Sequence, residues 1–367
     1  MKKVKLGEVT INIDNRRKPL NNLQRIEKSL TKKYPYCGAN NIIDFIDEYI
    51  FDENEEILCI AEDGGSWGKD EECTYVMNEK CWVNNHAHVL KMKTSVDINY
   101  IKLNLDYLDL TSYITGSTRG KLTKSSLEKI ELKLPDYHTQ ISISKRISDI
   151  QKLITKKKDQ IQKYKELVKS RFNEMFGSKK FDKVSISELV DDRIETAKKI
   201  FDQHDTIKYI DISSIDNKNY KMTGFQEFML NQAPSRAQQH IRKGDIVVST
   251  VRPNLKNIAI TELDDENLVA SSGFCVLRAL KCLPEYLFAI ICSDRFTNKM
   301  TNIVTGANYP AIKSSDIMNY IVPLPPIQLQ NEFADFVAQV DKSQLAIQKS
   351  LEELETLKKS LMQEYFG

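Results

Sequence analysis

The sequence predicts an α+β protein that is built twice: two mainly-β domains with helices, each followed by one long helix. Three observations support this fold class. The chain contains an internal duplication, each copy ends in a heptad pattern, and many short apolar runs separated by polar turns precede it. Because one chain carries both long helices, we expect them to pair antiparallel as a coiled coil.

The duplication is a repeat with an offset of 190 residues. Residues 111–177 and 301–367 align without a gap, and both copies end in Phe-Gly. In both, a Gln follows five residues after a Leu-Pro pair, Gln140 in the first copy and Gln330 in the second. The chain is therefore two cycles of one plan, a globular part followed by a helix.

Steps of four and three residues through each predicted helix reach mostly apolar positions, seven of nine in each copy. Such a pattern over four heptads is typical of a coiled coil, and each helix would be roughly 50 Å long. We expect the polar members to set register at some cost in stability. The seam positions are Ile147, Ile150, Ile154, Lys157, Ile161, Tyr164, Val168, Arg171 and Met175 in the first copy, and Val337, Val340, Gln344, Ile347, Leu351, Leu354, Lys358, Leu361 and Tyr365 in the second.

The amino-acid composition does not decide which kind of partner the protein binds. The net charge is +2 and 28% of residues are charged, a balance that neither demands nor forbids nucleic acid. The charge is uneven: residues 141–177 carry ten Lys/Arg and four Asp/Glu, a net of +6, whereas residues 331–367 carry four and seven, a net of −3. Opposite signs leave two readings open, two solvated faces or two helices that pair.

The chain contains no run of 18 apolar residues and no apolar core of a signal peptide at its start, so we expect no membrane span and a cytoplasmic protein. Seven cysteines without a C-x-x-C pair predict reduced, mostly buried thiols.

Short strands separated by polar turns dominate both globular parts. We expect strands over residues 4–11, 56–62 and 268–277, a turn that feeds a buried strand over residues 241–250, and helices over residues 97–112 and 284–296. Residues 34–41 have turn chemistry, and residues 114–121 and 303–310 form matching glycine loops. The predicted domains are residues 1–139 and 178–329, and the predicted spacer helices are residues 140–177 and 330–367.

No catalytic set emerges from the motifs. Pro325-Pro326 lacks the polar and aromatic neighbours of an amino-methyltransferase loop, and the glycines at 64–68 lack the spacing of a phosphate-binding loop. His86-x-His88 could ligate a metal, but no third ligand is evident by spacing, so a structural or DNA-facing role is favoured.

Local motifs make the chain similar to the DNA-specificity subunits of type I restriction–modification systems. They are residues 34–44 (YPYCGANNIID), 47–51 (DEYIF), 61–64 (AEDG), 81–90 (CWVNNHAHVL), 113–118 (YITGST) and 323–330 (PLPPIQLQ). The resemblance covers essentially the whole chain. It departs at Asp136-Tyr137, where the second copy keeps Pro326-Ile327.

The resemblance implies two target recognition domains, each reading one half of a split site in double-stranded DNA, held apart by two antiparallel helices. It also implies partners: methyltransferase subunits, expected to be two, and restriction subunits that act as motor and nuclease. No cofactor is expected in this chain, because S-adenosylmethionine would bind to the methyltransferase. A self-contained nucleic-acid-modifying enzyme and a coiled-coil scaffold for proteins remain the alternatives.

Residues expected to touch DNA are polar loop residues with amide, hydroxyl or guanidinium groups, since Arg reads guanine and Asn or Gln reads adenine. Arg119 and Arg252 are the strongest individual candidates. The predicted set is Tyr36, Asn40, Asn41, Ser66, Trp67, Lys69, Asn84, Asn85, Ser117, Thr118, Arg119 and Lys121 in the first half, and Ser249, Thr250, Arg252, Asn254, Lys256, Ser271, Ser272, Asn308 and Tyr309 in the second.

Overall fold

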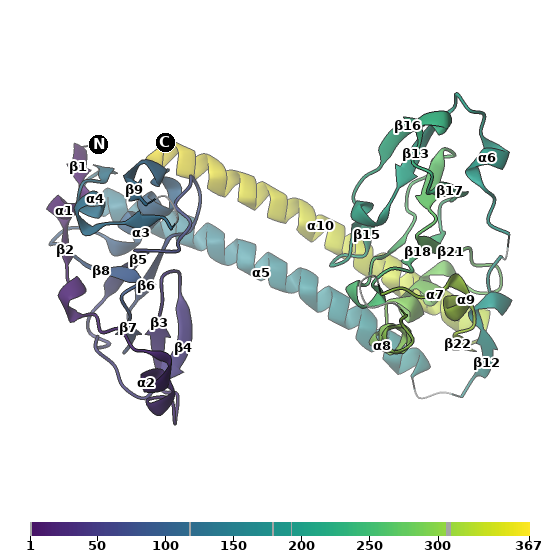
Figure 1. The fold of residues 1–367 in the computed structure, drawn as a ribbon, viewed down its shortest axis with the longest axis horizontal. Helices are drawn as coiled ribbons and strands as arrows, with labels where there is room; N and C mark the ends of the chain where they lie inside the picture. Colours follow the sequence, from purple (N-terminus) through teal and green to yellow (C-terminus); the bar gives the residue numbers. More distant parts are fainter. Residues whose placement is uncertain (1, 117–118, 178–179, 192, 306–309) are drawn as a thin grey trace. The chain divides into compact units, whose positions relative to one another are not determined.

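The chain folds into two compact units that share the two long helices. A computed structural model describes residues 2–116, 119–177, 180–191, 193–305 and 310–367. The first unit comprises Met1–Asp159 and Gln348–Gly367, and the second comprises Gln160–Ile347. Each long helix begins in one unit and ends in the other, so each unit contains part of both long helices (Figure 1).

The first unit is built on a four-stranded antiparallel sheet of order β2-β8-β5-β6. A three-stranded sheet β4-β3-β7 and the pairs β1-β11 and β9-β10 complete its strands. The strands are β1 (Lys2–Lys5), β2 (Thr10–Asn12), β3 (Tyr34–Cys37), β4 (Ile42–Ile46), β5 (Ile57–Ala61), β6 (Thr74–Met77), β7 (Trp82–Val83), β8 (Ala87–Met92), β9 (Ile114–Thr115), β10 (Lys121–Leu122) and β11 (Glu131–Leu134). The helices are α1 (Leu6–Val9), α2 (Asn22–Glu27), α3 (Ile98–Tyr107) and α4 (Lys124–Glu128), with 3₁₀ turns η1 (Asp14–Arg16) and η2 (Thr111–Tyr113).

The second unit has a mixed four-stranded sheet of order β16-β13-β20-β17, in which β13 and β20 are parallel. A three-stranded sheet β19-β18-β21 and the pairs β12-β22 and β14-β15 complete it. The strands are β12 (Asp182–Ser185), β13 (Thr206–Ile210), β14 (Ile215–Asp216), β15 (Lys221–Met222), β16 (Gln226–Met229), β17 (Ala237–His240), β18 (Ile246–Ser249), β19 (Ile258–Ile260), β20 (Leu268–Ser271), β21 (Phe274–Leu277) and β22 (Ile321–Leu324). The helices are α6 (Ala197–Ile200), α7 (Pro284–Ile291), α8 (Asp294–Asn302) and α9 (Ser314–Met318), with 3₁₀ turns η3 (Ile186–Glu188), η4 (Ile212–Ser214), η5 (Leu230–Gln232) and η6 (Pro253–Leu255).

The α+β class and the two long helices are confirmed, and four local predictions are corrected. The predicted strand 4–11 is interrupted by α1, and residues 34–37 of the predicted turn form β3. Pro35 is tolerated there because β7 pairs only with the two residues after it. The predicted strand 268–277 is two strands, and the predicted helix 284–296 is two helices, because Ser293 caps a new helix by accepting from the Phe296 N–H.

The two units share one frame around the start of each long helix. β1 pairs antiparallel with β11, and β12 pairs with β22 in the equivalent register. The buried Gln140 amide then accepts from the Asp97 N–H at 2.9 Å and donates to the Pro135 carbonyl at 2.9 Å. Gln330 makes the same two bonds at 2.8 Å each, from Leu283 and to the carbonyl of Pro325. The repeated Gln therefore locks a helix start onto its own globular part.

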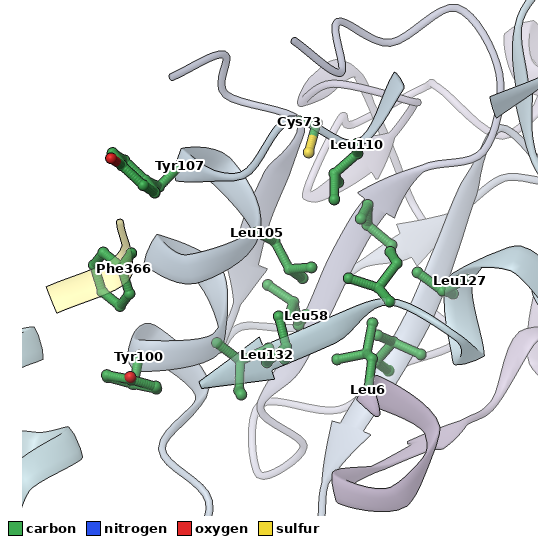
Figure 2. Close-up of a cluster of buried hydrophobic side chains, with 14 of the residues drawn as sticks. Leu6, Leu58, Cys73, Tyr100, Leu105, Tyr107, Leu110, Leu127, Leu132 and Phe366 are labelled. Carbon is green, nitrogen blue, oxygen red and sulfur yellow. The ribbon is translucent and has the colours of Figure 1, made fainter. Parts of the chain in front are cut away.

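The end of each long helix packs into the core of the other half of the chain. Helix α5 covers Tyr137–Phe176 and helix α10 covers Ile327–Phe366. Figure 2 shows Phe366 in the first unit beside Tyr100 and Tyr107, with ring centroids 5.3 and 6.0 Å away. In the second unit Phe176 packs against Tyr286 at 5.0 Å. The core of each unit is thus completed by the last residues of the long helix that begins in the other unit.

The predicted coiled-coil seam is confirmed within each unit, since every one of the eighteen seam positions is buried or half-buried. In the first unit Lys158 pairs with Glu355 at 2.9 Å, and Lys358 donates to Gln151 at 2.7 Å. In the second unit Gln344 donates to the Ile161 carbonyl at 3.4 Å. Residue numbers rise along α5 while they fall along α10 in both units, so the helices pair antiparallel.

The cysteines agree with the prediction of reduced, mostly buried thiols. All seven are free, six are buried, and Cys292 is half-buried. Burial raises the pKa of Cys73 to about 12 and that of Cys282 to about 11. Among the helices of the described ranges, none is both long and apolar enough to cross a membrane.

Candidate nucleic-acid interface

A hollow of about 330 Å³ opens in the first unit where four segments meet. The β3–β4 turn with the start of β4, the segment after β5 and the segment between β7 and β8 supply its wall, and Arg119 reaches it from between β9 and β10. The lining residues are Gly38, Ala39, Asn40, Asn41, Ile43, Asp63, Gly64, Asn84, His86 and Arg119. Four residues of the predicted DNA-contacting set therefore lie together here, although they come from positions up to 79 residues apart (119 − 40 = 79).

An ion-paired cluster dominates this hollow. The Asp63 carboxylate accepts from the Arg119 guanidinium at 2.9 Å and lies 2.8 Å from the His86 Nδ1. Arg119 remains 66% exposed, whereas the carboxylate is 18% exposed. The acid is thus seated in the protein while most of the guanidinium faces solvent. A guanidinium held in this way keeps donors available for a guanine edge or a phosphate.

Backbone contacts fix the rest of the hollow. Asn40 donates through its side chain to the Gly64 carbonyl at 3.2 Å and remains exposed, as does Asn41. Asn84 is buried, and its side-chain oxygen accepts from the His86 N–H at 2.8 Å. Asn84 therefore orders the turn that carries His86, while Asn40 and Asn41 are the amides that an incoming base could reach.

The other described residues predicted for the first unit lie elsewhere or face inward. Tyr36 and Trp67 are buried, the latter 8% exposed with its indole N–H donating to the Ala61 carbonyl. Lys69 lies over the Tyr107 ring at 5.0 Å, and Lys121 pairs with Glu62 at 2.9 Å. Ser66 and Asn85 are exposed outside the hollow lining. Tyr36 and Trp67 thus face the core in this structure, and as DNA contacts all of these residues stay predictions.

His88 lies in a charged network next to the hollow. Its Nδ1 lies 2.6 Å from Asp14 and its Nε2 lies 2.7 Å from the Leu122 carbonyl. The ligand atoms of Asp14, Glu62 and His88 lie within 4.8 Å of one another, as a metal site would require. Arg17, however, pairs with Glu62 at 2.6 Å and with Asp14 at 3.3 Å, and Lys121 pairs with Glu62 at 2.9 Å, so two cations already occupy the carboxylates. Of the structural and DNA-facing roles that the sequence left open for His88, this buried geometry fits the structural one.

Burial alone would raise the pKa of Asp14, but hydrogen bonds from His88, Asn12 and the Val89 N–H lower it below its usual value. The pKa of Glu62 is lowered in the same way, since Arg17 and Lys121 outweigh its burial. Both acids therefore stay ionised at neutral pH.

In the second unit the predicted residues gather on a strained loop, away from the hollow of about 470 Å³ that Phe181, Lys281 and Pro325 help to line. The loop follows β18 and runs from Thr250 to Lys256 around η6. Arg252 and Lys256 flank η6 with φ of 49° and 53°, the left-handed region that side chains other than glycine rarely adopt. Such a conformation costs of order 1–3 kcal/mol per residue and is retained only where the surroundings impose it. Strain of this kind is typical of functional loops.

Backbone bonds hold this loop against its neighbours. The Arg252 N–H donates to the Pro310 carbonyl at 2.8 Å, and the Thr250 carbonyl accepts from Ile312 at 2.9 Å. The Thr250 hydroxyl donates to the Gly273 carbonyl at 2.9 Å, and Asn217 donates to the Leu255 carbonyl at 2.9 Å. Through these contacts the backbone is fixed while the Arg252 and Asn254 side chains stay exposed.

The remaining predicted residues of the second unit divide by exposure. Ser249 and Ser271 are buried and bond to their own turns, Ser249 to the Val251 carbonyl and Ser271 to the Gly273 N–H. Ser272 is exposed, and Lys256 is half-buried in an ion pair. The predicted residues Ser117, Thr118, Asn308 and Tyr309 lie outside the described residues. As DNA contacts, all of these residues stay predictions.

Sequence reasoning missed Asp63 and His86 as members of the interface. His86 entered only as half of a metal pattern, and Asp63 only as part of a turn. A spacing of two residues places both rings on one face of a strand, so the local pattern could not separate them. The structure separates them because β8 begins at Ala87, which leaves His86 half-buried in the preceding turn and His88 buried in the strand.

The fold is a duplicated α+β plan, and each candidate surface carries an exposed arginine, Arg119 in the first unit and Arg252 in the second. This is the arrangement expected of a two-part recognition protein. The sequence profile described as "Type I restriction modification DNA specificity domain" matches residues 1–163 and 178–357. The chain therefore belongs to this family and carries its domain twice.

Individual relatives agree with this assignment. A putative type I restriction enzyme specificity subunit of Haemophilus influenzae is 31% identical over 140 residues, 38% of this chain and 34% of the relative. The MjaVIII specificity subunit of Methanocaldococcus jannaschii is 23% identical over 92% of this chain and 86% of the relative. The chain thus spans about a third of the first relative and most of the second.

A solved structure supports the fold over the full length. The crystal structure of a type I restriction–modification S subunit from M. genitalium covers 100% of this chain, and this chain covers 96% of it. The TM-score is 0.64 at 13% sequence identity. At that identity the likeness establishes the arrangement of the fold.

Proposed function

We propose that this protein reads a bipartite site in double-stranded DNA, one half-site with each unit, and delivers that recognition to a type I restriction–modification complex. The observation that carries the proposal is the doubled specificity domain, in which each copy presents an exposed arginine, Arg119 in the first and Arg252 in the second. Two different reading surfaces on one repeated frame fit a target with two unlike halves.

The chemistry of the two surfaces suits base readout. Arginine donates in a fork to the O6 and N7 of guanine in the major groove, and asparagine pairs with the edge of adenine. In the first unit we expect Arg119, Asn40 and Asn41 to make such contacts, with His86 beside them. In the second unit we expect Arg252 and Asn254 to do so. Exposed lysines outside these sites would add salt-dependent contacts to phosphates.

The chain itself would supply recognition, and partner subunits would supply the chemistry. We propose that methyltransferase subunits, two by the symmetry of the repeat, bind S-adenosylmethionine and transfer the methyl group. Restriction subunits with motor and nuclease activity would join the same complex. Since the target is chromosomal or invading DNA, we place the protein in the cytoplasm.

The long helices would act as the spacer between the two readers. Each of them contributes residues to both units, α5 through Tyr137–Phe176 and α10 through Ile327–Phe366. B-DNA turns once in about 34–36 Å, so the length of a helical spacer fixes how far apart two half-sites can be read on one face.

Co-expression with the adjacent methyltransferase gene, followed by single-molecule methylation mapping, tests the proposal. The expected result is one bipartite motif with two specified halves and an unspecified gap. The double variant Arg119→Ala/Arg252→Ala is the matched control and should lose the motif while the complex still assembles. A contiguous motif, DNA modification by the lone chain, or assembly without any DNA binding would overturn the proposal; the last two outcomes correspond to an enzyme and to a protein scaffold.

A further inference from the structure

We propose that Asp294 is a positioning residue for the reading loop of the second unit, and that it connects this loop to the long helix α5. The inference rests on the proposed function, because it assigns a role within the recognition of the second half-site. Asp294 lies outside the set of residues predicted to touch DNA, and its carboxylate contacts two lysines rather than the reading arginine.

The carboxylate of Asp294 joins two elements that are distant in the sequence. One oxygen accepts from the Lys256 ammonium, at the end of the reading loop, at 2.7 Å. The other accepts from the Lys169 ammonium, on α5, at 2.6 Å. All three residues belong to the second unit. The acid therefore bridges the loop and the helix with one oxygen for each.

Asp294 is itself held rigidly. It is the first residue of α8, whose N-terminus is capped by Ser293. A carboxylate at this position is favoured by the helix dipole, and its backbone cannot move without the helix. Helix α8 packs directly against η6, the turn that the loop contains. The bridge therefore starts from a fixed point beside the loop.

Both the backbone and the side chain of Lys256 are constrained. It adopts a left-handed backbone conformation and its side chain is only 23% exposed. Burial alone would lower the pKa of Lys256, but the hydrogen bond with Asp294 and the nearby Tyr220 raise it above its usual value. Hydrogen bonds from Lys169 and Lys256 hold the pKa of Asp294 at about 2. The bridge is thus fully ionised at neutral pH.

The bridge explains how the strained loop persists. Arg252 and Lys256 mark the two ends of the strained turn, and the contact with Asp294 holds the second of them. Without this contact Lys256 could return to an ordinary backbone conformation and move the loop that carries Arg252. The Arg252 guanidinium would then sample several directions. Recognition of a particular base should suffer more than general attraction to DNA, because only the former depends on direction.

The test uses the full chain assembled with its methyltransferase partner. Methylation rates are measured on the cognate site and on sites with single base changes in either half. Asp294→Asn should reduce discrimination in the second half-site about tenfold, with the first half-site unchanged. The matched control is Asp264→Asn, which breaks the exposed pair with Lys243 (3.2 Å) in the same unit. This control should leave discrimination in both half-sites unchanged.

Three further variants separate positioning from general stability. Asp294→Glu keeps the charge and should restore most of the discrimination. Lys169→Met removes the arm to α5 and should lower discrimination less than Asp294→Asn does. The double variant Lys169→Met/Asp294→Asn should be no worse than Asp294→Asn alone, because both changes break one bridge. Thermal unfolding of each complex identifies any variant that acts through loss of folding.

Two results would overturn the inference. One is a folded Asp294→Asn complex that discriminates the second half-site as well as the wild type does. The other is an equal loss in both half-sites, which would mark a general structural role. Failure of the proposed function is distinguishable from either, since then the wild-type complex itself would show no sequence discrimination.

Discussion

The two units repeat one frame and differ in what they build upon it. In each, a two-stranded pair precedes a helix start locked by a buried Gln, and a tyrosine receives the terminal phenylalanine of the other helix. The candidate surfaces diverge: that of the first unit lines a hollow in a unit with an all-antiparallel main sheet, whereas that of the second lies on the loop around η6 in a unit with a mixed sheet. The residues that pack against the long helices are therefore alike in the two units, and the residues away from the helices differ.

The two arginines are also presented by different means. Asp63 contacts Arg119 directly, so the acid orients the guanidinium itself. Asp294 contacts Lys256 and Lys169, so it acts on the backbone that carries Arg252. Direct pairing competes with DNA for the arginine, while support from the side leaves Arg252 free of that competition. We therefore expect the contact of Arg119 with DNA to contribute less binding free energy than the contact of Arg252 does.

Lengthening the shared helices should have the largest effect. One heptad added after Asp159 in α5 and one after Ile347 in α10 keeps the seam in register and adds about 10 Å. The gap in the methylated motif should grow by about three base pairs, at 3.4 Å per base pair. Methylation mapping measures the gap. A heptad added to α5 alone is the control and should abolish methylation; an unchanged gap with both insertions would contradict the spacer role.

Removing the terminal phenylalanines should destabilise one unit at a time. Phe366→Ala empties a buried position beside Tyr100 and should cost about 3–5 kcal/mol in the first unit. Phe176→Ala should do the same in the second unit. Hydrogen exchange resolved by segment measures each unit separately. Leu357→Ala, at an exposed position of α10, is the control, and equal destabilisation of both units by Phe366→Ala would show that the cores are not independent.

Single arginine changes should separate the two readers. Arg119→Ala should cost about 1–3 kcal/mol of discrimination in one half-site, and Arg252→Ala a similar amount in the other. Competition binding with half-site variants measures both at fixed salt concentration. Lys163→Ala, at an exposed position of α5, should weaken binding to all sequences alike. Loss of both half-sites from one arginine change would refute the division of labour.

The smallest effect concerns pH in the first unit. Arg16 and Lys91 hold the pKa of Glu55 at about 2, well below its ordinary value. A lowered folded-state pKa stabilises the protein above the ordinary pKa of a glutamate, and this stability is lost as pH falls from about 5 toward 2. Glu55→Gln should therefore flatten the acid limb of the stability curve of the first unit. Denaturant titrations at several pH values measure the free energy of unfolding. If the variant loses stability in acid as the wild type does, Glu55 is not a source of this pH dependence.

The sequence alone predicted the duplication, both long helices and their seam with good accuracy. Repeated residues such as Gln140 and Gln330 are visible at a fixed offset, and a heptad is a local pattern that needs no distant contact. The local errors arose where a short feature decides the boundary, as at Ser293, which starts a new helix inside one apolar run.

The reading surfaces could be predicted only in part. Arg119 and Arg252 were predicted because an arginine in a polar loop is a local signal; the structure exposes both, and as DNA contacts they stay predictions. Asp63 and Asp294 were not, because an acid gains its role from the cations that the fold brings to it from 56 and 125 residues away. Trp67 and Tyr36 belong to the predicted DNA-contacting set, yet the fold buries both side chains.

By itself, then, the sequence determined the fold class, the duplication and the paired helices, since these follow from periodicity and internal repetition; the class of protein came from the resemblance of its local motifs to a known family. The tertiary structure alone decided which loop residues face outward, which acid holds which base, and which half of the chain completes which core. Those features depend on contacts between segments far apart in the chain, and no local pattern of residues specifies such contacts.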